Sequence, residues 1–405
     1  MSIRTLTILA VAAGLAASSS AAEPAGRVVV LENLAPSGVR ALVFSADRLV
    51  WDRETGRAVA ELPEAALSPH SSPVPSMVEQ AAGSTFEGTV KHYLPEFEPG
   101  DRRPADGRWA VMEPASVVKP EALRPALAER RSASLADTTC LSQGFETLPV
   151  WYEDGGDWWH YEGGQSQNAV GDYYWLDTDC DAFGGSWSVD AVLGGTIGVT
   201  LPCDADYDVT TDSWLEYAPW ITCAYGAPGA QLNFYGKVAS ETGYDFFYYV
   251  VSTDGVNYVG YRLSGNFSDT WYQFTKDLRS WTSLGDLTAY PHFALAFVFQ
   301  SDDQVNTGFG ARLDNISVSV STIAVDTVYK VGNPFRLKVT GGGFLPGAWV
   351  YIDGVAVPRV SYKRPDLIVA KGGAALKSMV PFGQPVCVTV VNPNGGTSSC
   401  YMYTR

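Results

Sequence analysis

Apolar and polar residues alternate with a period of two through the middle of the chain, and this pattern predicts β-strands. Residues 244–253 alternate aromatic with β-branched side chains, Asp254 and Gly255 supply a turn, and residues 258–263 resume the alternation. Six further strands are predicted at residues 195–201, 214–223, 231–238, 271–277, 293–300 and 313–320. Almost no helical period interrupts them. We therefore predict an all-β unit over residues 140–321, a jelly-roll β-sandwich of two sheets.

The last part of the chain, residues 325–405, repeats the alternation on a smaller scale. Residues 335–339 and 349–352 each read as a strand, and Asp353-Gly354 is a two-residue hairpin turn. The length of about 80 residues fits seven short strands. This pattern predicts a small Ig-like β-sandwich.

Residues 23–139 show weaker periodicity. Two strands are predicted at 28–31 and 39–44, but residues 61–131 are rich in Pro, Ala, Glu and Arg, with one short helix predicted at 121–131. We expect a loosely packed N-terminal region or pro-segment and a flexible linker around 130–139. A small folded domain is the alternative.

The first 22 residues have the pattern of a secretory signal peptide. Arg4 precedes an apolar run at residues 6–17, and Ser20 and Ala22 are the small residues that signal peptidase prefers. The mature chain then begins at Glu23. No later stretch approaches twenty apolar residues, so we expect a secreted, periplasmic or cell-surface protein without membrane insertion.

Six cysteines in an exported chain predict three disulfides, because thiols pair in an oxidising compartment. Cys387 and Cys400 flank a turn between two predicted strands, and closing that loop would stabilise the fold by about 3 kcal/mol. Sequence order further suggests Cys203 with Cys223 and Cys140 with Cys180. Free buried thiols are the alternative.

Charge divides the chain into three electrostatically distinct segments. Lys+Arg against Asp+Glu number 14 and 17 in residues 1–140 (net −3), 5 and 24 in residues 141–321 (−19), and 9 and 3 in residues 322–405 (+6). The middle segment lacks the clustered cations that nucleic acid, anionic lipid or acidic polysaccharide would need. Neutral glycans, proteins and divalent cations remain as its partners.

The C-terminal unit resembles an IPT/TIG domain. The resemblance is carried by residues 341–347 (GGGFLPG), by Val350, by Ile352 with Asp353 and Gly354, and by residues 388–396. Members of that family are usually spacers or binding modules, so the resemblance implies an Ig-like fold and no enzyme.

The middle unit resembles the MAM-like jelly rolls appended to secreted bacterial proteases of the immune inhibitor A type. Gly144-Phe145-Glu146 opens it, and residues 251–255, 297–302 and 310–316 carry the rest of the resemblance. The zinc-binding HExxH of such proteases is absent. The resemblance thus implies the accessory domain without its catalytic partner, and a structural Ca²⁺ held by Glu146 and Asp314 where the first and last strands meet.

Two acidic runs also suggest Ca²⁺. Carboxylates recur at every second residue beside a cysteine, and hard cations bind several oxygens at once. The runs are Asp177, Asp179 and Asp181, and Asp204, Asp206 and Asp208. Neither is an EF-hand, and a solvated acidic loop is the alternative for both.

Aromatic residues near the start of the middle unit suggest a sugar-stacking platform. The candidates are Trp158, Trp159, Tyr161 and Tyr174. Alternatively these rings fill the core, because consecutive positions on a strand point to opposite faces and only one ring of a pair can face inward.

Catalysis is not expected. The four histidines, His70, His92, His160 and His292, have no ligand-spaced histidine neighbour, and no Glu-rich strand suggests a glycosidase. We expect a secreted, non-enzymatic binding or adhesion protein that recognises a glycan or protein. The alternative is an accessory or targeting subunit of a secreted hydrolase that binds neutral polysaccharide.

Overall fold

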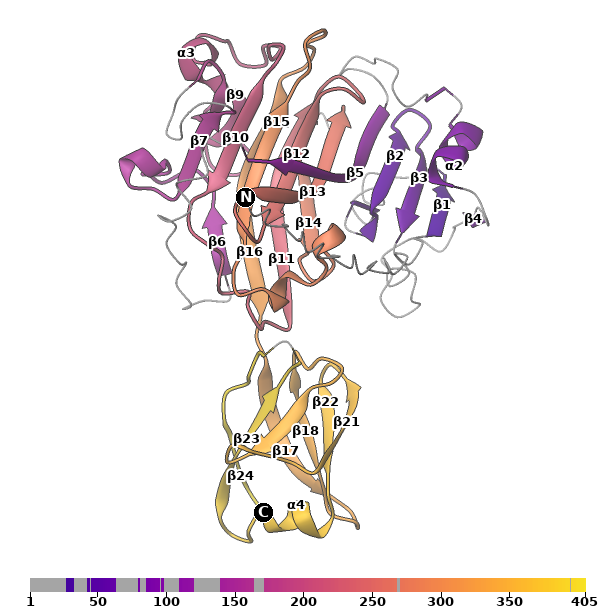
Figure 1. Ribbon diagram of the computed structural model, residues 1–405, viewed down its shortest axis with the longest axis vertical. Coiled ribbons are helices and arrows are strands. Elements are labelled where there is room, and N and C mark those ends of the chain that lie inside the picture. The colour runs from indigo at the N-terminus through magenta and orange to yellow at the C-terminus, as the bar shows by residue number, and fades with distance from the viewer. Residues whose placement is uncertain are drawn as a thin grey trace, which may run out of the picture.

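The computed structural model describes residues 27–32, 42–43, 45–62, 79–80, 85–94, 96–97, 109–119, 139–163, 171–267, 270–393 and 395–405. Across these residues the chain is built of antiparallel sheets, which confirms the predicted all-β class. A large β-sandwich contains the N-terminal and middle strands, and a small β-sandwich contains the C-terminal strands (Figure 1).

The first layer of the large sandwich, here called the broad sheet, has ten strands in the described residues. Their order is β4-β1-β3-β2-β5-β13-β12-β15-β10-β7. The bounds are β1 Arg27–Leu31, β2 Arg48–Asp52, β3 Arg57–Leu62, β4 Glu79–Gln80, β5 Trp109–Val118, β7 Trp158–Glu162, β10 Asp212–Tyr217, β12 Phe246–Ser252, β13 Asn257–Gly265 and β15 Ala294–Gln300.

The second layer, here called the narrow sheet, has the order β14-β11-β16-β9-β8, and β6 pairs with the lower part of β16. The bounds are β6 Thr139–Gln143, β8 Tyr174–Thr178, β9 Ser188–Gly194, β11 Gly229–Ala239, β14 Tyr272–Asp277 and β16 Gly310–Ser321. Short helical turns connect strands of both layers: η3 Tyr152–Asp154, α3 Gly195–Gly198, η4 Thr282–Leu284 and η5 Leu287–Ala289.

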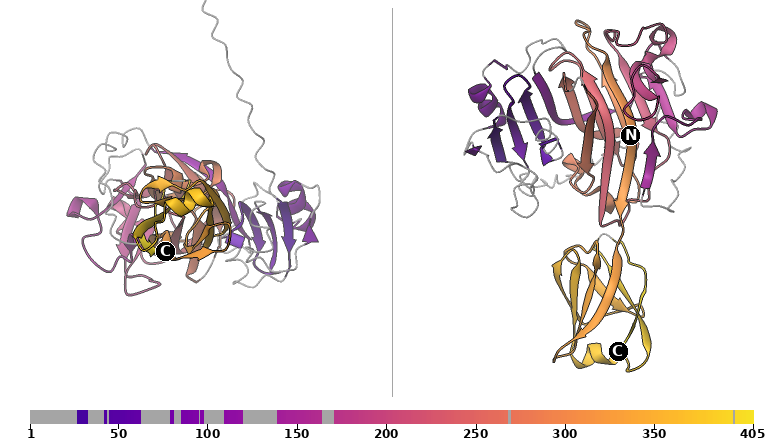
Figure 2. Two further views of the ribbon diagram at one scale, coloured as in Figure 1. Left: turned by 90° about the horizontal axis from the view of Figure 1, so that it is seen from below. Right: turned by 180° about the vertical axis from the view of Figure 1, so that it is seen from behind.

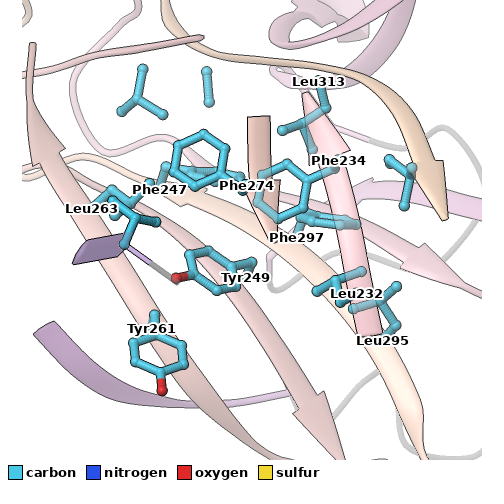
Figure 3. Close-up of a cluster of buried hydrophobic side chains, with 14 of the residues drawn as sticks. Leu232, Phe234, Phe247, Tyr249, Tyr261, Leu263, Phe274, Leu295, Phe297 and Leu313 are labelled. Atoms are coloured by element: carbon cyan, nitrogen blue, oxygen red, sulfur yellow. The ribbon is translucent and has the colours of Figure 1, made fainter. Parts of the chain in front are cut away.

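An aromatic core joins the two layers (Figure 3). Phe247 and Tyr249 on β12 point to the same side as Phe297 on β15, and they meet Phe234 from β11 and Phe274 from β14. Strand alternation places every second side chain here, and fully burying each such ring contributes about 1.5–3 kcal/mol. In these strands the residues that alternate as apolar in the sequence face the core between the two sheets.

The N-terminal region is not loosely packed where the structure describes it. β5 pairs with β13 over nine consecutive positions, from Asn257↔Val118 to Gly265↔Ala110, so the broad sheet continues directly into β1–β4 (Figure 1). Helix α2 (Phe86–Tyr93) begins at the N-cap Thr85 and buries Phe86 and Val90 against these strands. The extra strands are thus part of the large sandwich.

Several local predictions differ from the structure. Residues 195–201 were expected to be a strand, but Gly195 begins the short helix α3, and a Cβ at Gly195 would come within 2.3 Å of the Asp172 carbonyl oxygen. Within the predicted strand 39–44, Leu42 and Val43 are helical and buried. β7, β8 and β9 were not predicted. The helix predicted at 121–131 and the linker before Thr139 lie outside the described residues.

The small sandwich packs two four-stranded sheets, in the orders β17-β18-β22-β21 and β20-β19-β23-β24. Its strands number eight in the described residues, one more than expected. The bounds are β17 Ala324–Val331, β18 Arg336–Gly342, β19 Trp349–Ile352, β20 Val355–Ala356, β21 Arg359–Arg364, β22 Leu367–Lys371, β23 Pro385–Val391 and β24 Tyr401–Thr404, with helix α4 at Ala374–Ser378. Asp353 and Gly354 form the predicted β19–β20 turn with positive φ at both positions.

Backbone packing joins the two sandwiches. β16 runs down from the narrow sheet and leads within three residues into β17 (Figure 2). Beside this connection a Cβ at Gly396 would come within 1.7 Å of the Gly226 carbonyl oxygen. Only glycine lets the two loops approach so closely. No helix in the described part of the chain is long and apolar enough to cross a membrane.

The structure pairs the six cysteines as Cys140–Cys223, Cys180–Cys203 and Cys387–Cys400. The third pair is the predicted one, and it links β23 to the segment just before β24. The predicted pairs Cys203–Cys223 and Cys140–Cys180 are wrong. Cys140 lies on β6 of the narrow sheet and Cys223 follows β10 of the broad sheet, 83 residues later, so pairing neighbours along the chain gave the wrong partners.

Candidate functional site

The predicted aromatic platform is buried. Trp158 and Trp159 are each 1% exposed and Tyr161 is 0% exposed, while Tyr174 on β8 is half-buried. Trp158 points into the core between the layers, and Trp159 points to the opposite face of the broad sheet. Trp158, Trp159 and Tyr161 are therefore core residues, as the alternative expected, and both consecutive tryptophans are buried because neighbouring positions on β7 pack into two different clusters.

The outer face of the broad sheet has its own buried polar centre. Glu216 on β10 accepts hydrogen bonds from Tyr161, at 3.1 Å, and from Tyr258, and its carboxylate pairs with Lys119 at 2.8 Å. Both charged side chains are 0% exposed. Such a pair needs these extra hydrogen bonds to offset its desolvation. It fixes the end of β5 to β10.

An open groove lies between the edges of the two sheets, and we call it the edge groove. Its volume is about 440 Å³, and it lies beside β6 of the narrow sheet and β7 of the broad sheet. The lining residues are Thr139, Cys140, Leu141, Ser142, Gln143, Pro149, Asp157, Trp158 and Tyr217. The Cys140–Cys223 disulfide anchors the wall formed by β6.

The chemistry of the edge groove is polar and aromatic. Ser142, Gln143 and the exposed Asp157 offer hydrogen-bonding side chains, and the indole of Trp158 and the phenol of Tyr217 pack together at 5.3 Å between ring centroids. Burial, helped by the carboxylate of Asp157, raises the pKa of Tyr217 to about 12. The phenol therefore stays protonated at neutral pH. This set of groups suits hydroxyl-rich ligands.

His160 has a structural role. Its ring stacks on Trp151 at 3.8 Å, Nδ1 is 2.6 Å from the carbonyl oxygen of Trp175, and Nε2 is 2.6 Å from Glu153. Both ring nitrogens are thus used to hold β7 against its neighbours. His92 lies on α2 and His292 contacts Trp220, whereas His70 lies outside the described residues.

Glu146 and Asp314 hold the same loop. Asp314 Oδ2 accepts hydrogen bonds from the backbone N–H groups of Phe183 and Gly184, both at 2.9 Å, and Glu146 Oε1 accepts from Ser186 and Trp187. Burial, with a contribution from the charge of Glu146, raises the pKa of Asp314. The two carboxylates thus bind neighbouring backbone N–H groups of one loop, and the Ca²⁺ that the resemblance implies there stays a prediction.

The two acidic runs do not converge on metal sites. Asp181 pairs with Lys237 at 2.8 Å, Asp204 pairs with Arg312 at 2.6 Å, and Asp206 and Asp208 accept hydrogen bonds from Gly308 and Tyr173. Asp177 accepts from the Trp151 indole, and Asp179 is exposed. Burial raises the pKa of Asp181, but hydrogen bonds from Lys237 and Trp271 outweigh it and leave that pKa below its ordinary value.

Arg312 supplies a counter-charge to the second run. Its guanidinium is 1% exposed and donates to Asp190 and Asp204 at 2.6 Å each. The Cys180–Cys203 disulfide joins the two runs directly, and cations on adjacent positions of β11 and β16 neutralise them. Spacing along the chain could not reveal these cations because they come from strands over 30 residues away.

A third acidic group was not predicted from the sequence. One carboxylate oxygen from each of Glu241, Asp245 and Asp302 lies within 4.8 Å of the others. Asp245 is fully buried and accepts hydrogen bonds from the Tyr207 hydroxyl and from the Asp302 backbone N–H. Burial and this carboxylate raise the pKa of Tyr207. The group ties the loop after β15 to the loop before β12.

No family model and no curated protein matches the chain. Among solved structures, similar chains include the K2 cleaved adhesin domain of Lys-gingipain, with 16% identity, 45% of this chain and 98% of that chain covered, and a TM-score of 0.29. The family 11 carbohydrate-binding module of a cellulosomal cellulase of Clostridium thermocellum is 11% identical, with coverages of 44% and 92% and a TM-score of 0.27.

The adhesin domain of Epf from Streptococcus pyogenes is 9% identical, with coverages of 67% and 97% and a TM-score of 0.24. Scores in this range are too low to support a functional argument.

Proposed function

We propose that this chain is an exported, non-enzymatic binding protein whose large sandwich takes a neutral glycan in the edge groove. The observation that carries the proposal is the groove itself, which combines a volume of about 440 Å³ with the accessible polar side chains of Ser142, Gln143 and Asp157. Three disulfides support an extracytoplasmic setting.

Charge supports a neutral ligand over an acidic one. The groove contains the carboxylate of Asp157, and the surrounding segment has 24 acidic against 5 basic residues. A uronate or sulfate would be repelled there. Hydroxyl groups of a neutral sugar would instead donate to Asp157 and bond to Gln143 and Ser142.

The edge of β6 supports a second candidate ligand, an extended polypeptide. β6 pairs with β16 on one side, and its residues 139–143 line the groove on the other. A strand added to this edge would satisfy its backbone groups. We include the MAM-like and IPT/TIG resemblances in this proposal, since both suit a binding protein without catalytic machinery.

Replacing Gln143 and Asp157 by Ala tests the proposal, because both side chains line the groove and Asp157 is exposed. Trp158 and Trp159 are unsuitable, since removing core tryptophans costs about 3–5 kcal/mol of stability. A screen of neutral oligosaccharides would first identify a ligand, and calorimetry would then compare the variant with the wild type. We expect at least a tenfold loss of affinity, about 1.4 kcal/mol.

The matched control is a second groove of about 330 Å³ at the junction of the two sandwiches, where Gln231→Ala and Ser319→Ala remove similar groups. The control variant should bind as the wild type does. Wild-type protein that binds no neutral glycan, or equal losses in both variants, would contradict the proposed glycan site. A strand-like peptide competing for the groove would favour the second ligand.

A further inference from the structure

Three cations lie in one row across the small sandwich. Arg336 on β18 pairs in register with Lys371 on β22, and Lys371 pairs with Arg359 on β21. Residues opposite each other in a ladder point to the same face. The neighbouring positions Leu337, Ala370 and Val360 face the core, so the three cations face outward. We call them the cationic row.

The cationic row has no counter-charge in the described residues. Within the described residues of the small sandwich, Arg364 forms an ion pair with Asp366, and the carboxylate of Asp353 accepts a hydrogen bond from the Cys387 backbone N–H on the other sheet. Arg336, Lys371 and Arg359 form no ion pair with a described carboxylate, and the Nε of Arg336 is buried without a hydrogen-bond partner. Like charges placed opposite one another on a sheet are destabilising, so this arrangement opposes folding.

An aromatic ring lies beside the row. Tyr329 on β17 and Lys338 on β18 occupy the next outward position of the same sheet, with the Lys338 ammonium 5.7 Å from the ring centroid. Tyr329 is 40% exposed. The strands β17, β18, β22 and β21 lie side by side in the small sandwich (Figure 1). The face is therefore a sheet surface with cations at strand spacing and an accessible ring.

We propose that this face binds a linear acidic polysaccharide. Three strands span roughly 10 Å, and a row of cations at intervals of about 4.8 Å fits a single polyanionic chain lying across the strands. The carboxylate or sulfate groups of the polymer supply the missing counter-charges, and the ring of Tyr329 packs on a sugar face.

Other polyanions fit less well. A duplex nucleic acid or a membrane would also approach the large sandwich, whose segment 141–321 has a net charge of −19, from 5 basic and 24 acidic residues. A second copy of this chain would also bring its acidic large sandwich close to the row, and binding of this kind would appear as self-association in the test below. A single glycan chain touches the row alone. The molecule then holds a neutral ligand at one sandwich and an acidic one at the other.

The test measures binding of the full chain to polygalacturonate, a linear uronate polymer, with neutral dextran as the reference polymer. The triple variant Arg336→Gln, Arg359→Gln, Lys371→Gln should bind polygalacturonate at least tenfold more weakly. The slope of log affinity against log salt should also fall by roughly two to three, since about three counterions are no longer released. Tyr329→Ala should weaken binding about fivefold.

The matched control is Lys330→Gln, Lys363→Gln, Lys377→Gln, which removes the same charge from exposed lysines off the row. It should retain affinity within threefold. Thermal melting should show all variants folded, because the row variant loses repulsion and no ion pair.

If both triple variants lose the same affinity for polygalacturonate, the proposal is wrong, because net charge alone would then explain the binding. Wild-type chain that does not bind polygalacturonate would also overturn it. So would row-dependent binding to phosphatidylserine vesicles without binding to the polymer, or salt-sensitive self-association that the row variant abolishes.

Discussion

The large and small sandwiches share the same two-sheet architecture but differ in the residues that fill their cores and in their charge. The large core is dominated by aromatic rings from strands far apart in the sequence, whereas the small core is mostly Val, Leu and Ile with Phe335 and Phe344. The large sandwich is acidic and buries ion pairs, and the small one is basic with unpaired cations on its surface. The comparison teaches that the large sandwich depends on contacts between strands far apart in the sequence, whereas the small one is built of four hairpins that are joined by the β18–β22 and β19–β23 pairings.

Removing disulfides should give the largest difference between the two sandwiches. Cys140–Cys223 closes 83 residues and Cys387–Cys400 closes 13. The chain-entropy model gives losses of about 4.5 and about 3 kcal/mol in the free energy of unfolding when each pair is replaced by serine. Urea unfolding measures both losses: tryptophan fluorescence follows the large sandwich, since 9 of 12 tryptophans lie in residues 140–321, and far-UV circular dichroism follows both sandwiches. Equal losses in the free energy of unfolding for the two variants would contradict the expected difference between the sandwiches.

Calcium should stabilise only the large sandwich. If Glu146 and Asp314 hold Ca²⁺ at 100 times its dissociation constant, the free energy of unfolding rises by about 2.7 kcal/mol. Calorimetric melting with Ca²⁺ and with a chelator checks this, with Glu146→Gln and Asp314→Asn as the site variant. Asp179→Asn is the control, because Asp179 is exposed and outside the pair. A melting temperature that ignores the chelator would contradict the site.

Rising pH should also stabilise the large sandwich selectively. Lys276 on β14 donates to the Ala46 carbonyl oxygen at 3.0 Å, and burial lowers its pKa to about 7 despite the opposing charge of Asp47. Between that value and 10.5 the unfolded chain binds a proton that the folded chain does not, so stability increases with pH. The gain is at most about 2 kcal/mol from pH 7.5 to 9.

Urea unfolding at several pH values checks this rise, and Lys276→Met should flatten it. Lys237→Met is the comparison variant, since Lys237 pairs with Asp181. A wild-type stability that is constant over this pH range would show that Lys276 stays charged when buried.

The smallest predicted effect lies in the small sandwich. Lys371→Gln removes the middle charge of the cationic row and should raise the free energy of unfolding by about 0.5 kcal/mol. Lys377→Gln on α4 should leave it unchanged. Destabilisation by Lys371→Gln would mean that the row is held by interactions other than those seen in the structure.

Parts of the site were predictable and others were not. Cys387–Cys400 followed from two neighbouring strands and one turn, whereas the Ca²⁺ site of Glu146 and Asp314 stays a prediction, although both carboxylates hold the same loop. The two Asp runs suggested Ca²⁺ from their spacing alone, but Lys237 on β11 and Arg312 on β16 form ion pairs with Asp181 and Asp204. No local pattern marks the group of Glu241, Asp245 and Asp302, since it forms where two loops meet.

The sequence by itself determined the all-β class and most strands of residues 229–321, because period-two alternation is a local property that each strand carries. Only the tertiary structure decided that β5 extends the broad sheet, that Cys140 meets Cys223, and that Trp158 and Trp159 are both buried. These outcomes depend on which strand lies beside which and on whether a second layer covers the outer face. Such contacts join residues far apart in the chain, and no local pattern encodes them.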